Sequence, residues 1–463
     1  MPNTKFYFLL STIYVLLVFW KTKSWQKTVV YVYWPLAIYY VGQLYVFRVI
    51  QPEELNHPLY PDGRSLYFKF TPLMILSVAM LVSWLLRMIT ERIENNWLII
   101  ILLVGVFSRE ISAMSGGILP WWAQLGNMIN DVGLVLWLWW VIDYLRTNEN
   151  REKMFFWKYF CEILKITTIV GSILVIVQGI KGSALGLLVE QSSVLPYSGA
   201  GSDSGGWLVR PIGLWTHANV AAFSIWCQLL AWCLVRFYRE KKITVINQKW
   251  LLLPTTALIW LQSRSVFLSM IPVLGWWGYF YGDRIKLAIK EFQISTYGWF
   301  GGAGIMFLGA IVMVDRFWNS VTNFGIYSGW NTRGKLISVA TRVFSHHPWW
   351  GVGVGNFIPV AFREDLTKTM SYFPEAVHNG WMLILVEQGF IGVIIWLLFL
   401  IVLVIKWWKF TKNDRELRWF LVVILISQLT VMMFQPFSDI LTIVVAVDVL
   451  LLASEEGKRK ESF

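Results

Sequence analysis

Three short stretches carry the residues that could do chemistry in this chain. "RPIGLWTHANVAAF" begins at Arg210, "QSRSVFLSM" contains Arg264, and "EAVHNGWMLILVEQGF" contains His378. A guanidinium stays charged and binds phosphate oxygens through two parallel hydrogen bonds, so Arg210 and Arg264 suit a phosphate or pyrophosphate group. An imidazole titrates close to neutral pH, so His378 suits a general base that takes a proton from a hydroxyl group.

Each of these stretches also has a purely structural interpretation. Arg210 and Arg264 can anchor the chain at lipid head groups, where a long cationic side chain reaches water. His378 can lie at a membrane interface as an amphipathic ring. Asn219 and Asn379 begin apolar runs, where asparagine more often caps a helix than binds a ligand. The rest of the chain has to decide between the two interpretations.

Four further polar residues lie in or near these stretches. His217 has a structural interpretation beside a possible substrate contact. Arg333 opens the stretch "RGKLISVATRVF", where anionic lipid is the favoured partner and a phosphate-bearing substrate the second. His346 and His347 are adjacent, so their side chains are expected to point apart, and no metal site is predicted. The three cysteines show neither disulfide nor metal spacing.

The composition is that of a membrane protein. Of the 463 residues, 56% are hydrophobic and only 15% are charged, and the chain contains 29 Trp, 30 Phe and 18 Tyr. Soluble domains carry about 25% charged residues, which argues against a single water-soluble core. The net charge of +12 falls in short loops between apolar runs, so it indicates membrane orientation and not nucleic-acid binding.

Apolar runs recur along the whole length. We predict an all-α polytopic membrane protein with about 12–13 transmembrane helices, organised as a single integral membrane domain over residues 1–463. The first run is followed by Lys21 and Lys23 and not by a small-residue cleavage site, so we expect it to be retained. The predicted segments are approximately 6–20, 29–47, 70–86, 97–114, 128–145, 161–180, 217–235, 250–262, 266–281, 296–314, 380–405, 419–433 and 439–452.

Loop charges predict the orientation of these segments. Most of the 40 Lys and Arg residues lie in alternate loops: 21–28, 87–96, 146–158, 236–249, 284–290, 406–418 and 453–463. Positive residues stay in the cytoplasm, and long loops count less toward this bias. The other loops are therefore predicted to be external, which brings Arg210, Arg264, Arg333 and His378 to one external face. We predict a multi-pass protein of the cell membrane with its active site on that face.

The predicted external loop 315–379 is long enough to carry structure of its own, and loops of this length are usually functional. Leu336, Ile337, Ala340, Val343 and Phe344 recur at helical spacing within it. This pattern predicts an amphipathic helix lying in the membrane interface and ending before a proline. The "GVGVG" that follows resembles a nucleotide-binding loop only superficially, because no predicted strand precedes it.

The three stretches together resemble the O-antigen ligase and O-antigen polymerase family of integral membrane glycosyltransferases. The shared features are an arginine before a helix entry at Arg210, a Ser-Arg turn at Arg264, and an Arg-helix-Pro…Gly-x-Gly loop that closes with His378 and Asn379. The resemblance covers about a fifth of the chain and is concentrated in 333–404. Members of that family usually have about twelve membrane segments.

This resemblance implies a reaction. A glycan would pass from a polyprenyl-pyrophosphate donor to a hydroxyl acceptor on a glycan or another molecule, outside the cell and without a cofactor or metal, with polymerisation favoured over ligation. His378 would be the base, and Arg210 and Arg264 would stabilise the pyrophosphate. The substrate-binding residues would be Asn379, Asn219, Arg333 and His217.

A transporter or flippase of lipid-linked glycans is the alternative of a different class. Such a protein needs polar sites near the bilayer midplane on broken helices. Arg109, Asp131, Lys165 and Asp448 fall within or beside apolar segments and favour it. The long external loop and the absence of an internal repeat favour the enzyme. The bilayer itself is an expected partner in both cases.

Overall fold

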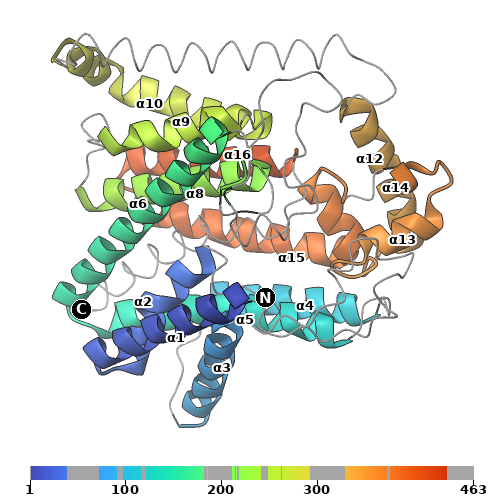
Figure 1. The fold of residues 1–463 in the computed structure, drawn as a ribbon, viewed down its shortest axis with the longest axis horizontal. Helices are drawn as coiled ribbons and strands as arrows, with labels where there is room; N and C mark the ends of the chain where they lie inside the picture. The colour runs from blue at the N-terminus through green and yellow to red at the C-terminus, as the bar shows by residue number, and fades with distance from the viewer. Residues whose placement is uncertain are drawn as a thin grey trace.

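The computed structural model describes residues 2–38, 72–90, 97–115, 121–181, 185, 211–213, 215, 218–240, 249–261, 263–291, 329–372 and 376–434. All regular structure in this part of the chain is helical, as the sequence predicted (Figure 1). The helices are α1 (Pro2–Thr22), α2 (Trp25–Ile38), α3 (Pro72–Thr90), α4 (Trp97–Ser115), α5 (Trp121–Thr147), α6 (Asn150–Lys181), α8 (Ala218–Glu240), η5 (Lys249–Leu251), α9 (Leu252–Leu261), α10 (Arg264–Glu291), α12 (Gly329–His346), α13 (Phe357–Glu364), α14 (Thr369–Tyr372), α15 (Gly380–Phe410) and α16 (Arg415–Met432).

Each predicted segment within the described residues coincides with one of these helices. Three of them, α6, α8 and α15, are long and apolar enough to cross a membrane, and shorter apolar helices surround them. The protein is therefore an all-α membrane protein. The predicted segments 296–314 and 439–452, and the second half of 29–47, lie outside the described residues.

Contacts between helix ends define one end of the bundle. Lys27 at the start of α2 pairs with Glu152 at the start of α6, at 3.0 Å. The Tyr281 hydroxyl, far along α10, donates to Glu416 in the first turn of α16, at 3.0 Å. The rings of Tyr238 near the end of α8 and of a phenylalanine at the end of α15 lie 6.0 Å apart. We call this end, which carries the turns 23–24, 148–149 and 411–414, the basic end.

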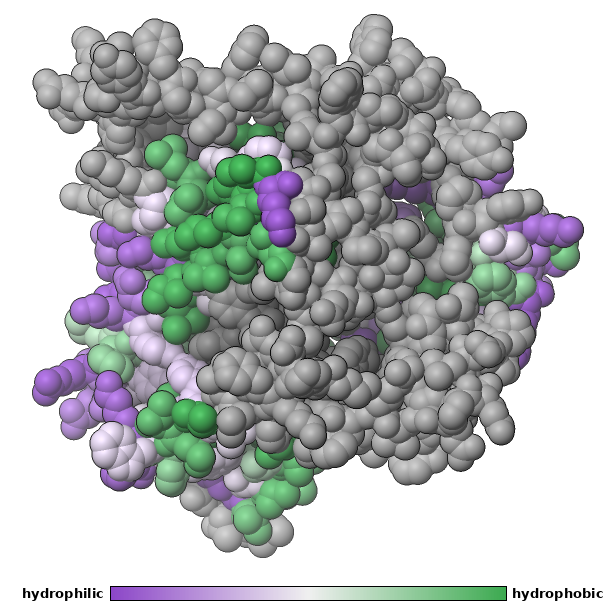
Figure 2. Space-filling model, in the orientation of Figure 1, coloured by the Kyte–Doolittle hydropathy of each residue, from purple (hydrophilic) through white to green (hydrophobic). Residues whose placement is uncertain are grey.

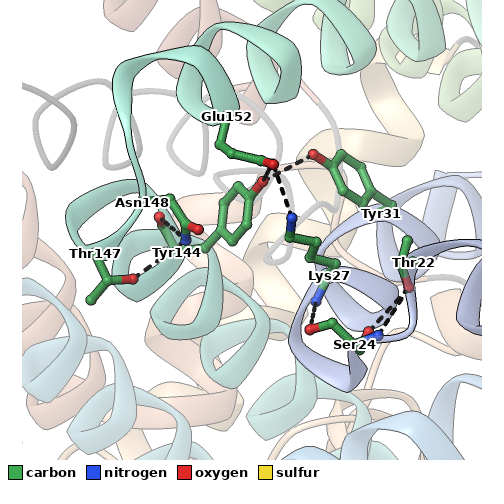
Figure 3. A network of polar contacts seen from close by, with 8 residues as sticks. All are labelled: Thr22, Ser24, Lys27, Tyr31, Tyr144, Thr147, Asn148 and Glu152. Carbon is green, nitrogen blue, oxygen red and sulfur yellow. Dashed lines mark hydrogen bonds and ion pairs between the residues drawn. The ribbon is translucent and has the colours of Figure 1, made fainter.

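A polar network at the basic end holds the α1–α2 turn against the α5–α6 turn (Figure 3). The Tyr144 hydroxyl donates to the Glu152 carboxylate at 2.7 Å, and Lys27 Nζ donates to the same carboxylate at 3.0 Å. The Tyr31 and Tyr144 hydroxyls lie 3.2 Å apart. The carboxylate is therefore shared between two helix pairs, which ties the first part of the bundle together.

The opposite end, which we call the loop end, carries the starts of α8, α10 and α15 together with α12, α13 and α14 (Figure 1). The side chain of Gln178, in the last turn of α6, accepts from the N–H groups of Ile212 and Gly213 at 3.0 and 2.7 Å. These bonds hold the chain just before α8 against the end of α6.

Helix α8 runs through the middle of the bundle and is buried along most of its length. The Thr167 hydroxyl of α6 donates to Gln228 of α8 at 2.6 Å, and Trp226 of α8 donates to Ser427 of α16 at 3.1 Å. Polar side chains that pair between helices stabilise membrane bundles, because lipid offers them no partner. Figure 2 shows hydrophobic residues on the face of the bundle in view, next to hydrophilic residues at its edge.

The exposed side chains of α15 mark where this helix faces lipid. None of residues 380–389 is exposed, whereas an exposed apolar stripe begins at Phe390 and ends at Trp408. Eighteen residues of helix rise about 27 Å, close to the roughly 30 Å of a bilayer's hydrocarbon core. The stripe consists of Phe390, Ile394, Leu397, Leu398, Ile401, Ile405 and Trp408.

The loop residues form a second, smaller hydrophobic core around the first turns of α15. We call 329–372 together with 376–388 the loop module. Helix α12 packs on α13, α14 and α15, and it buries Leu336, Val339, Ala340 and Val343. The amphipathic pattern of α12 is therefore satisfied by protein contacts, although Ile337, grouped with the buried face from the sequence, is 41% exposed. The core of the loop module consists of Leu336, Val339, Ala340, Val343, Val352, Phe357, Val360, Ala361, Met370, Val377, Leu383 and Val386.

Candidate functional site

His378 lies directly before the N-terminus of α15, at the loop end. Asn379 is the N-cap: its side-chain oxygen accepts from the Met382 N–H at 2.9 Å, and its own N–H donates to the Val377 carbonyl at 2.8 Å. An N-cap asparagine satisfies helix N–H groups that have no partner within the helix. The cap interpretation of Asn379 is confirmed, and it gives the partly buried His378 a defined backbone position.

Helix α15 is broken at Gly389, whose φ of 66° and ψ of −167° are not helical. The break leaves carbonyl groups before it without their usual partners. The Val352 N–H donates to the Val386 carbonyl and the Gly353 N–H donates to the Glu387 carbonyl, each at 2.9 Å. The loop that follows α12 therefore completes the first part of α15.

Carbonyl groups of the same loop accept hydrogen bonds from the N–H groups of α15 just beyond the break. The Phe390 N–H donates to the Pro348 carbonyl at 2.8 Å, and the Ile391 N–H donates to the Trp349 carbonyl at 3.2 Å. Irregular backbone at membrane depth is tolerated where protein satisfies it. Segment 348–353 is therefore docked into the break along both of its sides.

Two glycines allow this close approach. Gly351 has a φ of 69°, and a Cβ there would meet the carbonyl of Glu387. A Cβ on Gly389 would meet the backbone of Trp349. Only glycine populates the conformation of Gly389 without a large cost. These positions explain two of the glycines of the "GVGVGNF" and "EQGF" stretches without any ligand.

The glycine-rich loop is not a phosphate cradle. A cradle of that kind aims several backbone N–H groups at an anion. Within 351–356, the N–H groups that donate to oxygens of the protein are those of Gly351, Val352, Gly353, Gly355 and Asn356. The superficial likeness to a nucleotide loop therefore has no counterpart in the geometry.

Arg264 is the first residue of α10, and two residues separate it from the end of α9, so the break predicted at the Ser-Arg turn is confirmed. Its side chain is partly buried, and it makes no hydrogen bond or ion pair with any residue that the structure describes. The neighbouring Ser263 and Ser265 hydroxyls lie 3.2 Å apart, and the Ser263 carbonyl accepts the Phe267 N–H at 3.1 Å. A guanidinium without a counter-ion in the described part of the chain is thus held at a helix N-terminus, where the dipole also favours an anion.

Of the remaining predicted site residues, the structure describes Asn219 and Arg333. Asn219 is the second residue of α8 at the loop end, and Arg333 lies in the first turns of α12, partly buried. Arg210 and His217 lie outside the described residues. Asn219, Arg264 and His378 therefore lie at or directly before the starts of α8, α10 and α15, at the loop end.

His346 and His347 have a contact that the sequence did not suggest. His346 Nδ1 lies 3.0 Å from one oxygen of Glu364 in α13, and His347 Nε2 lies 3.7 Å from the other. The expectation that the two rings point apart is wrong, because the end of α13 packs against the end of α12 and offers one carboxylate to both. Among the described residues there is no group of three ligands that could hold a metal ion.

Two residues at the break were not singled out by sequence reasoning. Glu387 accepts the Gly355 N–H through Oε1 at 2.9 Å, and Ser112 of α4 donates to the Glu387 carbonyl at 2.8 Å. The signal for them was the glycine at position 389 inside a long apolar run, which marks a possible break. Nothing in the sequence pairs that break with the loop before it.

Comparison with known proteins gives one family match. Residues 250–397 match the family model described as O-antigen ligase, a range that includes Arg264, Arg333, His378 and Asn379. No curated protein matches the chain. The matched range contains the break in α15, the loop module and the start of α10, which is the part of the molecule that forms the candidate site. Over residues 250–397, the chain is therefore similar to the O-antigen ligase family.

Proposed function

We propose that this protein is a glycosyltransferase of the ligase or polymerase type that uses a polyprenyl-pyrophosphate-linked glycan as its donor. The acceptor is a hydroxyl group, and the reaction takes place at the loop end, on the external face of the membrane. The family match supports a membrane enzyme that acts on lipid-linked glycans. The donor group, the acceptor and the side of the membrane are the parts that the proposal adds.

The observation that carries the proposal is the Arg264 guanidinium. It is partly buried at the N-terminus of α10 and has no anionic partner among the described residues. Desolvating a cation is costly unless an anion compensates it. A pyrophosphate would supply that anion through a bidentate contact, and the same contact would stabilise the charge that develops as the pyrophosphate leaves. Arg210 would complete this site.

His378 would act on the acceptor. The acceptor oxygen attacks the anomeric carbon, and the bond from that carbon to the pyrophosphate oxygen breaks. The acceptor proton passes to His378, and the electron pair of the broken bond leaves with the polyprenyl pyrophosphate. A positioned base of this kind contributes about 10²–10⁴-fold. The guanidinium groups take the role that a metal ion plays in other phosphate chemistry, so we propose a metal-independent reaction.

The other predicted residues take supporting roles in this proposal. Asn219 at the start of α8, Arg333 on α12 and His217 would contact donor or acceptor. Asn379 uses its side-chain oxygen in the helix cap, which leaves its side-chain amide N–H groups for a sugar. Ligation and polymerisation share the donor chemistry and differ in the acceptor. We propose polymerisation, in which the acceptor hydroxyl belongs to another lipid-linked glycan.

One observation favours the transporter as a second candidate. Transporters bind substrate on broken membrane helices, and α15 is broken at Gly389. At this break, however, the carbonyl groups of Val386 and Glu387 and the N–H groups of Phe390 and Ile391 all bind the loop 348–353. Those backbone groups have partners in the protein, which argues against the ion and substrate coordination that a transporter needs.

Purified protein and a defined lipid-linked donor separate the two candidates. In detergent, no bilayer separates two compartments. A glycosyltransferase in detergent still releases polyprenyl pyrophosphate and forms longer glycans. A transporter does neither, yet it moves labelled donor across a vesicle bilayer. Detergent-solubilised protein without transfer activity, combined with donor translocation in vesicles, would contradict the enzyme. In cells, deletion of the gene should leave lipid-linked glycan unprocessed.

A further inference from the structure

The loop module meets the membrane bundle at the first half of α15 and at the break. Leu383 and Val386, before the break, belong to the core of the loop module, whereas Ile384 belongs to the core of the membrane bundle. Phe399 and Leu403, after the break, also belong to the bundle core. The first half of α15 therefore contacts both parts of the protein, and the second half contacts the bundle.

The proposed catalytic residues are divided between the loop module and the bundle. His378 precedes the first half of α15 and is part of the loop module, because its neighbour Val377 is buried in that core. Arg264 begins α10, which packs on α16 in the bundle. The distance between base and leaving-group site therefore depends on how the two parts are held together at the break.

Two sets of contacts join them at this point, and a third fastens the loop itself to α15. Backbone hydrogen bonds join the loop 348–353 to both sides of the break. Ser112 of α4 donates to the Glu387 carbonyl at 2.8 Å and also to the Trp350 carbonyl, so one bundle side chain bonds both the helix and the loop. The Glu387 carboxylate accepts the Gly355 N–H at 2.9 Å.

The carboxylate contact differs from the others in what it holds. Glu387 is only 5% exposed, and a buried carboxylate is unfavourable unless hydrogen bonds satisfy it. Gly355 lies beyond the backbone pairs at Val352 and Gly353, directly before α13 begins at Phe357. The carboxylate thus connects the break in α15 to the start of α13, a helix that contributes to the core of the loop module.

We propose that Glu387 is a positioning residue for His378. Its carboxylate fastens Gly355 to the first half of α15, which keeps the loop 348–353 in place to accept the Phe390 and Ile391 N–H groups beyond the break. In this way it keeps the loop module, with the base, in register with the bundle that carries Arg264. The inference rests on the proposed function. Misplacing a catalytic group by about 1 Å costs up to about 10²-fold in rate. Loosening the loop therefore lowers kcat, whereas donor binding at Arg264 is unchanged.

Two substitutions at Glu387 separate geometry from charge. Glu387→Leu removes the acceptor, and we expect kcat to fall about 10–10²-fold with KM for donor within about twofold. Glu387→Gln keeps an oxygen that can accept the Gly355 N–H, and we expect it to retain kcat within about threefold of the wild type. A folded Gln variant as slow as the Leu variant would overturn the positioning role, because the charge itself would then be needed.

Ser112→Ala tests the same closure with a milder change, and it decides the matter if Glu387→Leu does not fold. It removes both hydroxyl contacts and adds no volume, so we expect a smaller fall in kcat, again without a change in KM. Unchanged kcat in a folded Glu387→Leu variant, or in Ser112→Ala where Glu387→Leu does not fold, would overturn the proposal. Glu364→Gln is the matched control. This carboxylate also belongs to the loop module and contacts His346, but Glu364 lies far from Gly389 in the sequence. We expect it to leave kcat unchanged.

A distance measurement tests the closure without any activity. Spin labels at Ser338→Cys on α12 and Leu268→Cys on α10 report the loop module and the bundle, and both positions are exposed. We expect a narrow distance distribution in the wild type, in Glu387→Gln and in Glu364→Gln, and a broad or displaced one in Glu387→Leu. An unchanged distribution in Glu387→Leu would overturn the positioning role. If the wild type showed no transfer activity, the proposed function would fail while the distance result still decided the role of Glu387.

Discussion

At the residue scale, the account depends on side chains whose surroundings match a chemical task. Arg264 is held at a helix N-terminus, partly buried, with no counter-ion among the described residues. Asn379 caps α15 and so defines the place of His378. The sequence singled out Arg264 and His378 by residue type and predicted that they lie on the same side of the membrane. It could not show that Asn379 uses its oxygen on the helix, because capping depends on where the helix begins.

Arg264→Lys keeps the positive charge but loses the two parallel hydrogen bonds of the guanidinium. Hydrogen bonds to charged groups contribute about 1.5–3 kcal/mol, so we expect kcat/KM to fall by about 10–10²-fold. Steady-state kinetics with purified protein measures this. Arg342→Lys, at an exposed arginine of α12, is the control and should keep full activity. Wild-type kinetics in Arg264→Lys would show that Arg264 only anchors the chain in the membrane.

Asn379 carries a prediction about stability. Asn379→Ala removes the cap and should cost about 0.5–2 kcal/mol in the free energy of unfolding. Asn379→Ser can still accept the Met382 N–H and should keep most of that stability. Thermal unfolding in detergent compares the two variants. If Ser keeps stability but loses activity, Asn379 also contacts substrate; equal stability of Ala and wild type would contradict the cap.

At the element scale, the decisive feature is the break in α15. The apolar run after Gly380 predicted one continuous membrane helix, and the periodicity of 390–408 fits that prediction. Leu383 and Val386, before the break, instead belong to the core of the loop module, while Ile384 packs in the bundle core. Composition could not reveal this, because a buried protein core and a bilayer select the same apolar residues. The same ambiguity explains α12, whose amphipathic pattern suggested lipid contact and whose face is covered by protein.

Gly389→Ala tests the geometry of the break. Its φ of 66° and ψ of −167° are accessible only to glycine at low cost, and its Cβ would meet the backbone of Trp349. Strain of this kind costs of order 1–3 kcal/mol before the collision is counted, so Tm should fall by several degrees. Gly275→Ala in α10, where a Cβ meets nothing within 4 Å, should be neutral or slightly stabilising. Equal Tm values for the two variants would contradict the break.

At the scale of the whole molecule, the loop charges predicted which turns lie at the same end of the bundle, which hydrophobic periodicity could not predict. The basic end carries the turns 23–24, 148–149 and 411–414, and the loop end carries the proposed site, as alternate loop charges indicated. The predicted segments overlap the apolar helices of the described residues, although α5, α6 and α10 extend well beyond them and α13 and α14 were not predicted. The division into a bundle and a loop module was not, because it depends on contacts between 348–355 and α15 that no local pattern encodes.

Cysteine accessibility tests the orientation. A cysteine at Ser371 on α14, or at Ser202 in a predicted external loop, should react in intact cells with a thiol reagent that cannot cross the membrane. A cysteine at Asn413, in the turn between α15 and α16, should react only after the cells are opened. The unmodified protein gives the background from its own cysteines. Reaction at 413 in intact cells would invert the orientation and place the proposed site in the cytoplasm.

The central claim is that His378 is the base, and kinetics of purified His378→Ala test it most directly. We predict that turnover falls about 10²–10⁴-fold while donor affinity changes little, because the arginines and not the histidine hold the pyrophosphate. His346→Ala, at an exposed histidine of the same loop module that contacts Glu364, is the control and should keep near wild-type turnover. A His378→Ala protein that turns over donor at the wild-type rate would contradict the account.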